Sequence, residues 1–393
     1  MKIKMTPVNL DHISANHILP EARDKMVRAM EKNYGNPSGQ NSGADEAILA
    51  LDEARESVAR LIHCKTPREV VFTSGGTESV NHAIKGAAFA NSEKGRHIVT
   101  TNIEHNSANK SLKRLSQMGF SATSVGVDSK GRVNPDDVAK AITDETILVS
   151  VMHSNNEIGT FQPIEEISKI TKEKKILFHS DAVDSVGVVP VDVQKLGVDL
   201  MSFASNPYYG PVGVGGLYVR QGVRVWPILD GGIQERNKRA GTENIIGIVG
   251  MGEAARLARE NMDDRIAHIK GLRDLVIEEL PNHIDNYYIN GDPENGLPNL
   301  LSVAIRYIEG ESIVLMLDDD GYRVSTRSAC ATGSLRASHV LMSIGLDHAD
   351  AQGVIMVTPG IENTREDIMG FLKSLQDIVK SLRDISPLCR KTT

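Results

Sequence analysis

The sequence is poor in cysteine, with only Cys64, Cys330 and Cys389 among 393 residues. They lie far apart and form no CxxC pair, which argues against a disulfide scaffold or a cysteine-rich zinc site. Cys64 follows an amphipathic segment and is expected to be structural, and Cys389 lies in a polar tail. Cys330 sits among small polar residues, where an accessible thiolate can act as a nucleophile, a sulfur carrier or a metal ligand.

An excess of positive charge and long apolar runs are also missing. The chain has 44 basic and 51 acidic residues, interspersed along its length, and a net charge of -7. This balance gives no electrostatic footprint for nucleic acid. No run reaches the roughly 18 apolar residues of a membrane span, and residues 1–12 have no apolar signal core. We expect a cytoplasmic protein that binds neither nucleic acid nor a membrane.

What the sequence does have is alternation. Between about residues 70 and 220, short β-rich runs alternate with amphipathic runs, which predicts an α/β fold with a mostly parallel sheet covered on both faces. After about residue 245 the pattern predicts a smaller α+β unit. The length also favours two domains. We expect a large domain at 15–260, and a small domain formed by 1–14 with 265–393 that carries the Cys330 loop.

Polar motifs follow several of the predicted strands, where ligands of such folds bind. In "FTSGGTES" (72–79) a strand meets two glycines and a helix start, so that the backbone N–H groups of Gly76 and Thr77 form a candidate phosphate cradle. The alternative is an ordinary helix start with Thr77 as N-cap. In "HSDAVDS" (179–185), Asp181 is a candidate carboxylate for a ring N–H⁺, or a helix cap.

Two further strand ends carry candidate ligand contacts. His105 in "IEHNSA" could stack on an aromatic ring or move a proton. Asn155 and Asn156 in "MHSNNEIG" are either ligand contacts or loop polar groups.

Taken in order, these motifs resemble the cysteine desulfurases of the NifS/IscS type, which are class V aminotransferase-like enzymes of fold type I. The resemblance covers nearly the whole chain. Its most specific segments are "GNPS", "FTSGGTES", "EH", "NNEIG", "YGP", "RAGTEN" and "SAC". It implies a homodimer with pyridoxal phosphate (PLP), which takes sulfur from cysteine as a persulfide on a loop cysteine and passes it to an acceptor or iron–sulfur scaffold protein.

The resemblance assigns a role to several positions. Gly76 and Thr77 match the phosphate loop, and His105 matches the ring-stacking histidine. Asn156 matches a cofactor-facing asparagine and Asp181 the partner of the pyridine nitrogen. Thr242 matches a threonine that reaches the phosphate across the dimer, and Cys330 matches the persulfide-forming cysteine.

The chain departs from the family where the cofactor's aldehyde is held. The family's Ser-Gly-His-Lys turn supplies a Schiff-base lysine, but this chain has Ala204, Ser205, Asn206 and Pro207. Other family residues are also replaced. Asp184 stands for a glutamine at the phenolic oxygen, Met356 for the substrate-binding arginine, His12 for an aromatic residue, Asn41 for a histidine and Arg327 for a glycine. PLP is therefore expected to be bound without a covalent bond or not at all.

Three functions remain open. The first is a sulfur-transfer or iron–sulfur assembly protein that acts through Cys330, as a persulfide carrier or as a thiolate of a cluster shared with a scaffold partner. The second is a working cysteine desulfurase with non-covalent PLP. In the third, the remodelled pocket binds another ligand, with His12, His105, Asp181 and Asp184 converging on a divalent metal. Lys238 could replace the missing lysine, although a surface lysine is the simpler interpretation.

Overall fold

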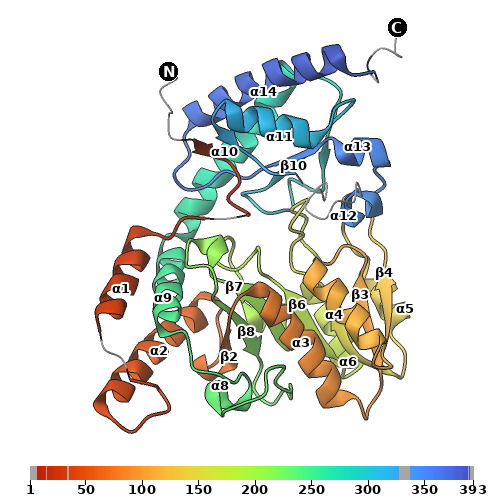
Figure 1. The fold of residues 1–393 in the computed structure, drawn as a ribbon. Coiled ribbons are helices and arrows are strands. Elements are labelled where there is room, and N and C mark those ends of the chain that lie inside the picture. Colours follow the sequence, from red (N-terminus) through yellow and green to blue (C-terminus); the bar gives the residue numbers. More distant parts are fainter. Residues whose placement is uncertain (1–6, 15, 33–34, 327–336, 388, 390–393) are drawn as a thin grey trace.

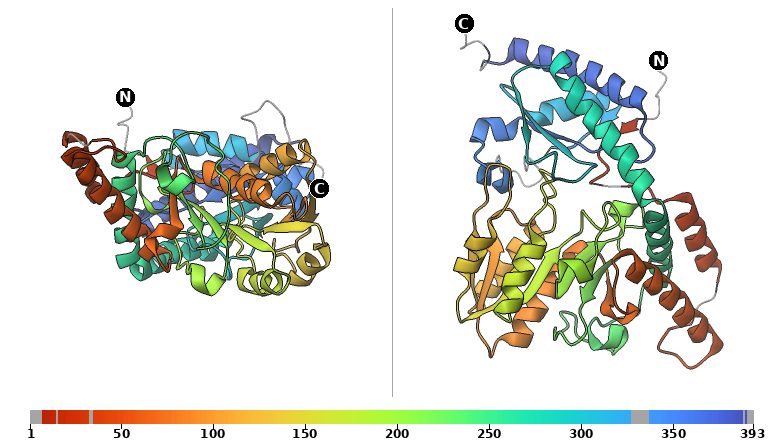
Figure 2. Two further views of the ribbon diagram at one scale, coloured as in Figure 1. Left: turned by 90° about the horizontal axis from the view of Figure 1, so that it is seen from below. Right: turned by 180° about the vertical axis from the view of Figure 1, so that it is seen from behind.

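The computed structural model describes residues 7–14, 16–32, 35–326, 337–387 and 389. Two units are stacked one on the other (Figure 1). We call them the large unit, built around a seven-stranded sheet, and the small unit, built around a three-stranded sheet. The long helices α9 (Ile245–Glu260) and α10 (Met262–His283) lead from the large unit into the small one, and the helix axis is interrupted at Asn261 (Figures 1 and 2).

The large unit confirms the predicted α/β sheet. Its strand order is β2-β8-β7-β6-β5-β3-β4, and every neighbouring pair is parallel except the two pairs that involve β8. The carboxyl ends of the other six strands therefore lie along one edge of the sheet. The strands are β2 (Val70–Thr73), β3 (His97–Thr101), β4 (Ser121–Val125), β5 (Thr146–Ser150), β6 (Leu177–Asp181), β7 (Leu200–Ala204) and β8 (Gly215–Val219).

Alternate strand residues enter two different cores. Val99, Val149 and Met201 belong to one apolar cluster, whereas their neighbours Leu148 and Leu200 belong to another. A period of two is the side-chain period of a strand, so both faces of the sheet are buried. The first core includes α2, α6 and α9, and the second includes α3 and α4. The helices before α9 are α1 (Pro20–Glu31), α2 (Ser42–Leu61), α3 (Gly76–Asn91), α4 (Asn106–Ser116), α5 (Pro135–Ala141), α6 (Ile164–Glu173), α7 (Val193–Leu196) and α8 (Gln234–Asn237).

The small unit is an antiparallel sheet of order β12-β10-β9 packed against α10, α11 and α14. The N-terminal segment joins it, since β1 (Val8–Asn9) pairs in parallel with β11 (Tyr322–Arg323) and Leu10 lies in its core. The predicted division of the chain into domains stays a prediction. The remaining elements are β9 (Tyr287–Asn290), β10 (Leu301–Ile305), α11 (Gly310–Asp319), α12 (His339–Ser343), α13 (His348–Gln352), β12 (Val354–Val357) and α14 (Arg365–Ile385).

The edge strand β2 is covered by the turn Gln234–Asn237 (α8). The buried Glu235 accepts a hydrogen bond from the Phe72 N–H at 3.0 Å, and the Arg236 guanidinium donates to the Val70 carbonyl at 2.6 Å. Side chains thus occupy backbone groups that an exposed edge would offer to another strand. Among the described helices, none is long and apolar enough to cross a membrane.

Candidate functional site

The start of α3 has the shape of an anion cradle. Gly75 precedes the helix with φ 146° and ψ -178°, a conformation that favours glycine, and a Cβ built there would meet no heavy atom within 4 Å. A Cβ on Gly76 would lie 2.6 Å from Cγ2 of Val183, so this position has room for glycine alone. Thr77 is exposed in the first turn, where N–H groups lack partners within the helix. Gly75, not Thr77, is the N-cap, so the interpretation of Thr77 as an ordinary cap is wrong.

One carboxylate ends β6, a second follows it, and a third acts on the first through its charge. Asp181 is buried at the strand end and accepts a hydrogen bond from the Val183 N–H at 3.1 Å. Burial raises the pKa of Asp181 well above its ordinary value, and the negative charges of Asp184 and Glu104 raise it further. A ring N–H⁺ would supply the positive partner that this buried carboxylate lacks among the described residues.

Glu104 is a site residue that sequence reasoning missed. It is fully buried, accepts hydrogen bonds from Thr101 Oγ1 (2.7 Å) and the Met152 N–H (3.0 Å), and its Oε2 has no partner among the described residues. Burial raises its pKa to about 7. The available signal was an acid placed directly before His105 at the end of an apolar strand, because such a position is seldom buried without a reason.

His105 and Asn156 lie at neighbouring strand ends. His105 is exposed and is the N-cap of α4, with Nδ1 2.7 Å from Ser107 Oγ and 3.1 Å from the Ser107 N–H. Asn155 is structural. Its side-chain amide donates to the Ile103 carbonyl, and its Oδ1 accepts from the backbone N–H groups of Glu157 and Ile158. The half-buried Asn156 makes no side-chain hydrogen bond within the described chain. Their roles toward a ligand stay predictions.

Thr242 is exposed on the loop between α8 and α9. Arg239, on the same loop, pairs with Glu78 in the first turn of α3 at 3.0 Å, and Glu78 accepts the Ser74 N–H at 2.8 Å. This loop is therefore fixed to the cradle of its own chain, and a role of Thr242 in a partner's site stays a prediction. Cys330 lies outside the described residues, as does Arg327.

The turn after β7 is rigid and holds no lysine. Asn206–Tyr208 forms one 3₁₀ turn with Pro207 in its middle, closed by a hydrogen bond from the Tyr209 N–H to the Asn206 carbonyl. The Asn16 side chain donates to the carbonyls of Asn206 (2.9 Å) and Pro207 (3.3 Å). The N-terminal segment thus holds this turn in place through Asn16.

The position expected to bind a substrate carboxylate is apolar. Met356 in β12 is fully buried and clusters with Leu297 and Leu300 of the small unit, against Phe161 and Val188 of the large unit. A carboxylate desolvated against these side chains would lack a charged partner.

His12 has its hydrogen-bond and ion-pair contacts away from Asp181 and Asp184. It is buried, with Nδ1 2.6 Å from Asn16 Oδ1 and Nε2 3.5 Å from Glu362 Oε1, and its ring lies 6.0 Å from that of Tyr209. In the described part of the chain, no group of three or more His, Cys, Asp or Glu side chains could hold a metal ion. The convergence of His12, His105, Asp181 and Asp184 on a metal is thus not observed.

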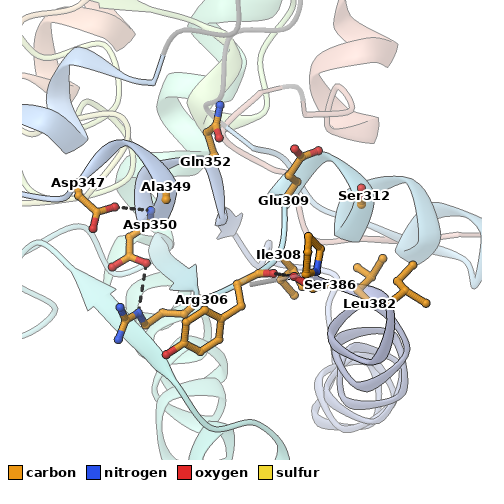
Figure 3. A pocket seen from close by; sticks show the side chains of 13 residues that line it. Arg306, Ile308, Glu309, Ser312, Asp347, Ala349, Asp350, Gln352, Leu382 and Ser386 are labelled. Carbon is orange, nitrogen blue, oxygen red and sulfur yellow. Dashed lines mark hydrogen bonds and ion pairs between the residues drawn. The ribbon is translucent and has the colours of Figure 1, made fainter. Parts of the chain in front are cut away.

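The cavity in Figure 3 lies in the small unit and has a volume of about 500 Å³. Several of its polar groups are already hydrogen-bonded within the cavity wall. Arg306 Nε is 3.2 Å from Asp350 Oδ1, the Asp350 N–H donates to Asp347, and Ser386 Oγ donates to the Tyr307 carbonyl. Within the part of the chain that the structure describes, none of the sequence motifs singled out as candidate ligand contacts lines this cavity, so the strand ends remain the candidate site.

Comparison with known proteins finds relatives that match this chain over nearly its whole length. The family model "Aminotransferase class-V" matches residues 8–371. A protein named cysteine desulfurase IscS from Dictyoglomus turgidum is 47% identical over 380 residues, 97% of this chain and 96% of that protein. One of the same name from Methanosarcina thermophila is 44% identical over 384 residues, 98% of this chain and 95% of that protein. A solved structure titled "NIFS-LIKE PROTEIN" superposes with a TM-score of 0.90 at 36% identity, covering 96% of this chain and all of that one.

Proposed function

Because the chain belongs to the class V aminotransferase family, and within it to the cysteine desulfurases of the NifS/IscS type, we propose that it transfers sulfur for iron–sulfur cluster assembly. Cys330 is the residue proposed to carry the sulfur as a persulfide, or to lend a thiolate to a cluster on a scaffold protein. The proposed assembly is a homodimer that meets a sulfur acceptor or scaffold.

The family implies PLP, and this chain retains residues that fit two ends of it. The N–H groups of Gly76 and Thr77 would hold the phosphate, and Asp181, whose pKa is raised by burial, would pair with the protonated ring nitrogen. When bound, PLP acts as an electron sink for bonds at the substrate's α-carbon. Pro207 offers no amine at the aldehyde end, so we propose that the cofactor is held without a covalent bond to position 207.

The first form of this proposal is a sulfur carrier without ordinary desulfurase activity. The observation that carries it is that two family residues are replaced in the same chain, by Pro207 and by Met356. No side chain at 207 can move a proton, and a positioned acid or base contributes about 10²–10⁴-fold in rate. The apolar cluster around Met356 offers no grip for the carboxylate of cysteine. In this form, ordinary cysteine desulfuration is lost, and Cys330 receives sulfur that was mobilised elsewhere.

The second form is a working cysteine desulfurase, and the comparisons favour it. Relatives that are 44–47% identical over nearly the whole chain are named cysteine desulfurase. The cradle and Asp181 support this form as well, because they would hold the phosphate and the ring nitrogen.

One experiment separates the two forms. The purified chain is given cysteine and PLP, and sulfide is measured with and without Cys330→Ala. Turnover above the no-protein control that requires Cys330 supports the working desulfurase. In a second arm, the chain without PLP is offered a small-molecule persulfide. The thiolate of Cys330 would attack the terminal sulfur, forming the Cys330 persulfide and releasing the donor as its thiolate, which mass spectrometry detects as one added sulfur atom.

Sulfur uptake at Cys330 without turnover of cysteine supports the carrier form. If the chain shows no turnover of cysteine and takes up no sulfur at Cys330, both forms are overturned. Turnover that survives Cys330→Ala would also count against the role given to this residue.

A further inference from the structure

A second polar pocket lies at the opposite end of the large unit's sheet from the candidate site. It has a volume of about 520 Å³ and lies between the start of β2 and the end of β8, beside α8. In Figure 1, α8 is on the side of the large unit that faces away from the small unit. Arg68, Arg220, Arg236 and Lys238 line it, together with Glu69. We call it the basic pocket.

Three acids around the basic pocket already have partners. Asp199 pairs with Arg220, with 2.7 Å between Oδ1 and Nε. Glu69 accepts the N–H groups of Lys65 (3.0 Å) and Gln221 (2.9 Å). Glu235 forms a two-fold pair with Arg55, at 2.7 and 2.8 Å. Counting the lining charges outside these pairs, three cations face the single carboxylate of Glu69.

Those three cations keep donors free. The side chains of Arg68 and Lys238 make no hydrogen bond or ion pair within the described chain. Arg236 donates one hydrogen bond to the Val70 carbonyl and lies 3.6 Å from Glu235, but its Nε is buried without a partner.

The basic pocket contains backbone strain in α8 and repulsion between like charges. Glu235, Arg236 and Asn237 all have positive φ values, of 46°, 57° and 61°. A left-handed conformation costs about 1–2 kcal/mol for each residue other than glycine. The pKa of Lys238 is lowered by burial and by the nearby charges of Arg236 and Arg68. Strain of this kind concentrates at functional sites, and an anion would relieve the repulsion.

We propose that the basic pocket binds a small ligand that carries a diphosphate group. Two guanidinium groups and one ammonium group around a concave site suit several phosphate oxygens at once. Arg236 and Lys238 precede Arg239 on the same loop, and Arg239 is bound to Glu78 at the start of α3. This proposal does not depend on the proposed function.

Isothermal titration calorimetry of the full chain with inorganic pyrophosphate, at constant ionic strength, tests the proposal. We expect saturable binding that Lys238→Gln and Arg68→Gln each weaken about fivefold or more, since a lost charge contact of about 1 kcal/mol corresponds to such a factor. Lys113→Gln, which removes an exposed lysine from α4, is the matched control and should change the dissociation constant less than twofold. Circular dichroism checks that each variant is folded.

Three results would overturn the proposal. The first is no saturable heat beyond that of sodium chloride at equal ionic strength. The second is equal weakening by Lys113→Gln and Lys238→Gln, which indicates non-specific attraction. The third is binding that both pocket variants leave unchanged, which would place the anion outside the basic pocket. Binding of an acidic protein without binding of pyrophosphate gives the first result and also refutes a small-ligand site.

Discussion

Replacing Arg55 by methionine should destabilise the chain strongly, because it leaves a carboxylate buried without its main partner. The Glu235 side chain is 1% exposed and receives two charge-assisted hydrogen bonds from Arg55, at 2.7 and 2.8 Å. Breaking a buried pair by removing one partner costs about 3–5 kcal/mol. Arg236 lies 3.6 Å from Glu235 and compensates in part, so we expect a loss near 3 kcal/mol, the lower end of that range.

The chain offers a matched control on the same helix. Arg60 pairs with Glu56 at 2.9 Å on the exposed side of α2. An exposed pair at this spacing contributes about 0.3–0.5 kcal/mol, so Arg60→Met should cost several times less than Arg55→Met. The double variant Arg55→Met with Glu235→Leu removes both charges and should be more stable than Arg55→Met alone.

The assay is urea unfolding followed by circular dichroism at one fixed chain concentration, since association changes apparent stability. If Arg55→Met and Arg60→Met lower the free energy of unfolding equally, the pair is not buried as described. If the double variant is less stable than Arg55→Met, the uncompensated charge is not the cause of the loss.

Three further outcomes are expected. Light scattering at micromolar concentration should give twice the chain mass of 42.7 kDa, and a single-chain mass would contradict the homodimer. Between about pH 4.5 and 7 the folded carboxyl of Glu104 keeps a proton that the unfolded chain releases, so the free energy of unfolding should fall with rising pH by about 3 kcal/mol. Glu104→Gln should remove this fall in pH-dependent urea unfolding, and an unchanged slope would refute the buried acid. Pro207→Lys alone should gain weak absorbance with PLP but little sulfide production, since its neighbours remain altered, and family-level turnover would show that the pocket was intact. Larger recovery should require a set of changes: Ala204→Ser, Asn206→His, Asp184→Gln and Met356→Arg.

The sheet could be predicted because its strands are short apolar runs separated by amphipathic helices. β3, β5 and β7 are buried along their whole length, so that local composition alone marks them. The antiparallel direction of β8 could not be predicted, because a buried strand has the same apolar composition whether it runs parallel or antiparallel to its neighbours. In the small unit, β1 and β11 have two residues each, and strands this short carry no periodic signal.

Within the candidate site, the glycines of the cradle and the acid at the end of β6 could be predicted, because turn and strand chemistry is local. What could not be predicted depends on distant contacts. His12 packs against Asn16 and Tyr209 instead of the carboxylates, and only the tertiary fold decides this. The buried state of Glu104 depends likewise on hydrogen bonds from Thr101 and the Met152 backbone, across two strands.

The pairing of β1 with β11 has a consequence for synthesis of the chain on the ribosome. Val8 and Asn9 are made more than 300 residues before their partners Tyr322 and Arg323. Asp11 likewise accepts a hydrogen bond from Ser325, which is 314 residues later in the sequence. A nascent chain that stalls before residue 322 therefore leaves this segment without its strand partner. Such a chain cannot complete the small unit, and this segment becomes a natural point of recognition for chaperones and proteases.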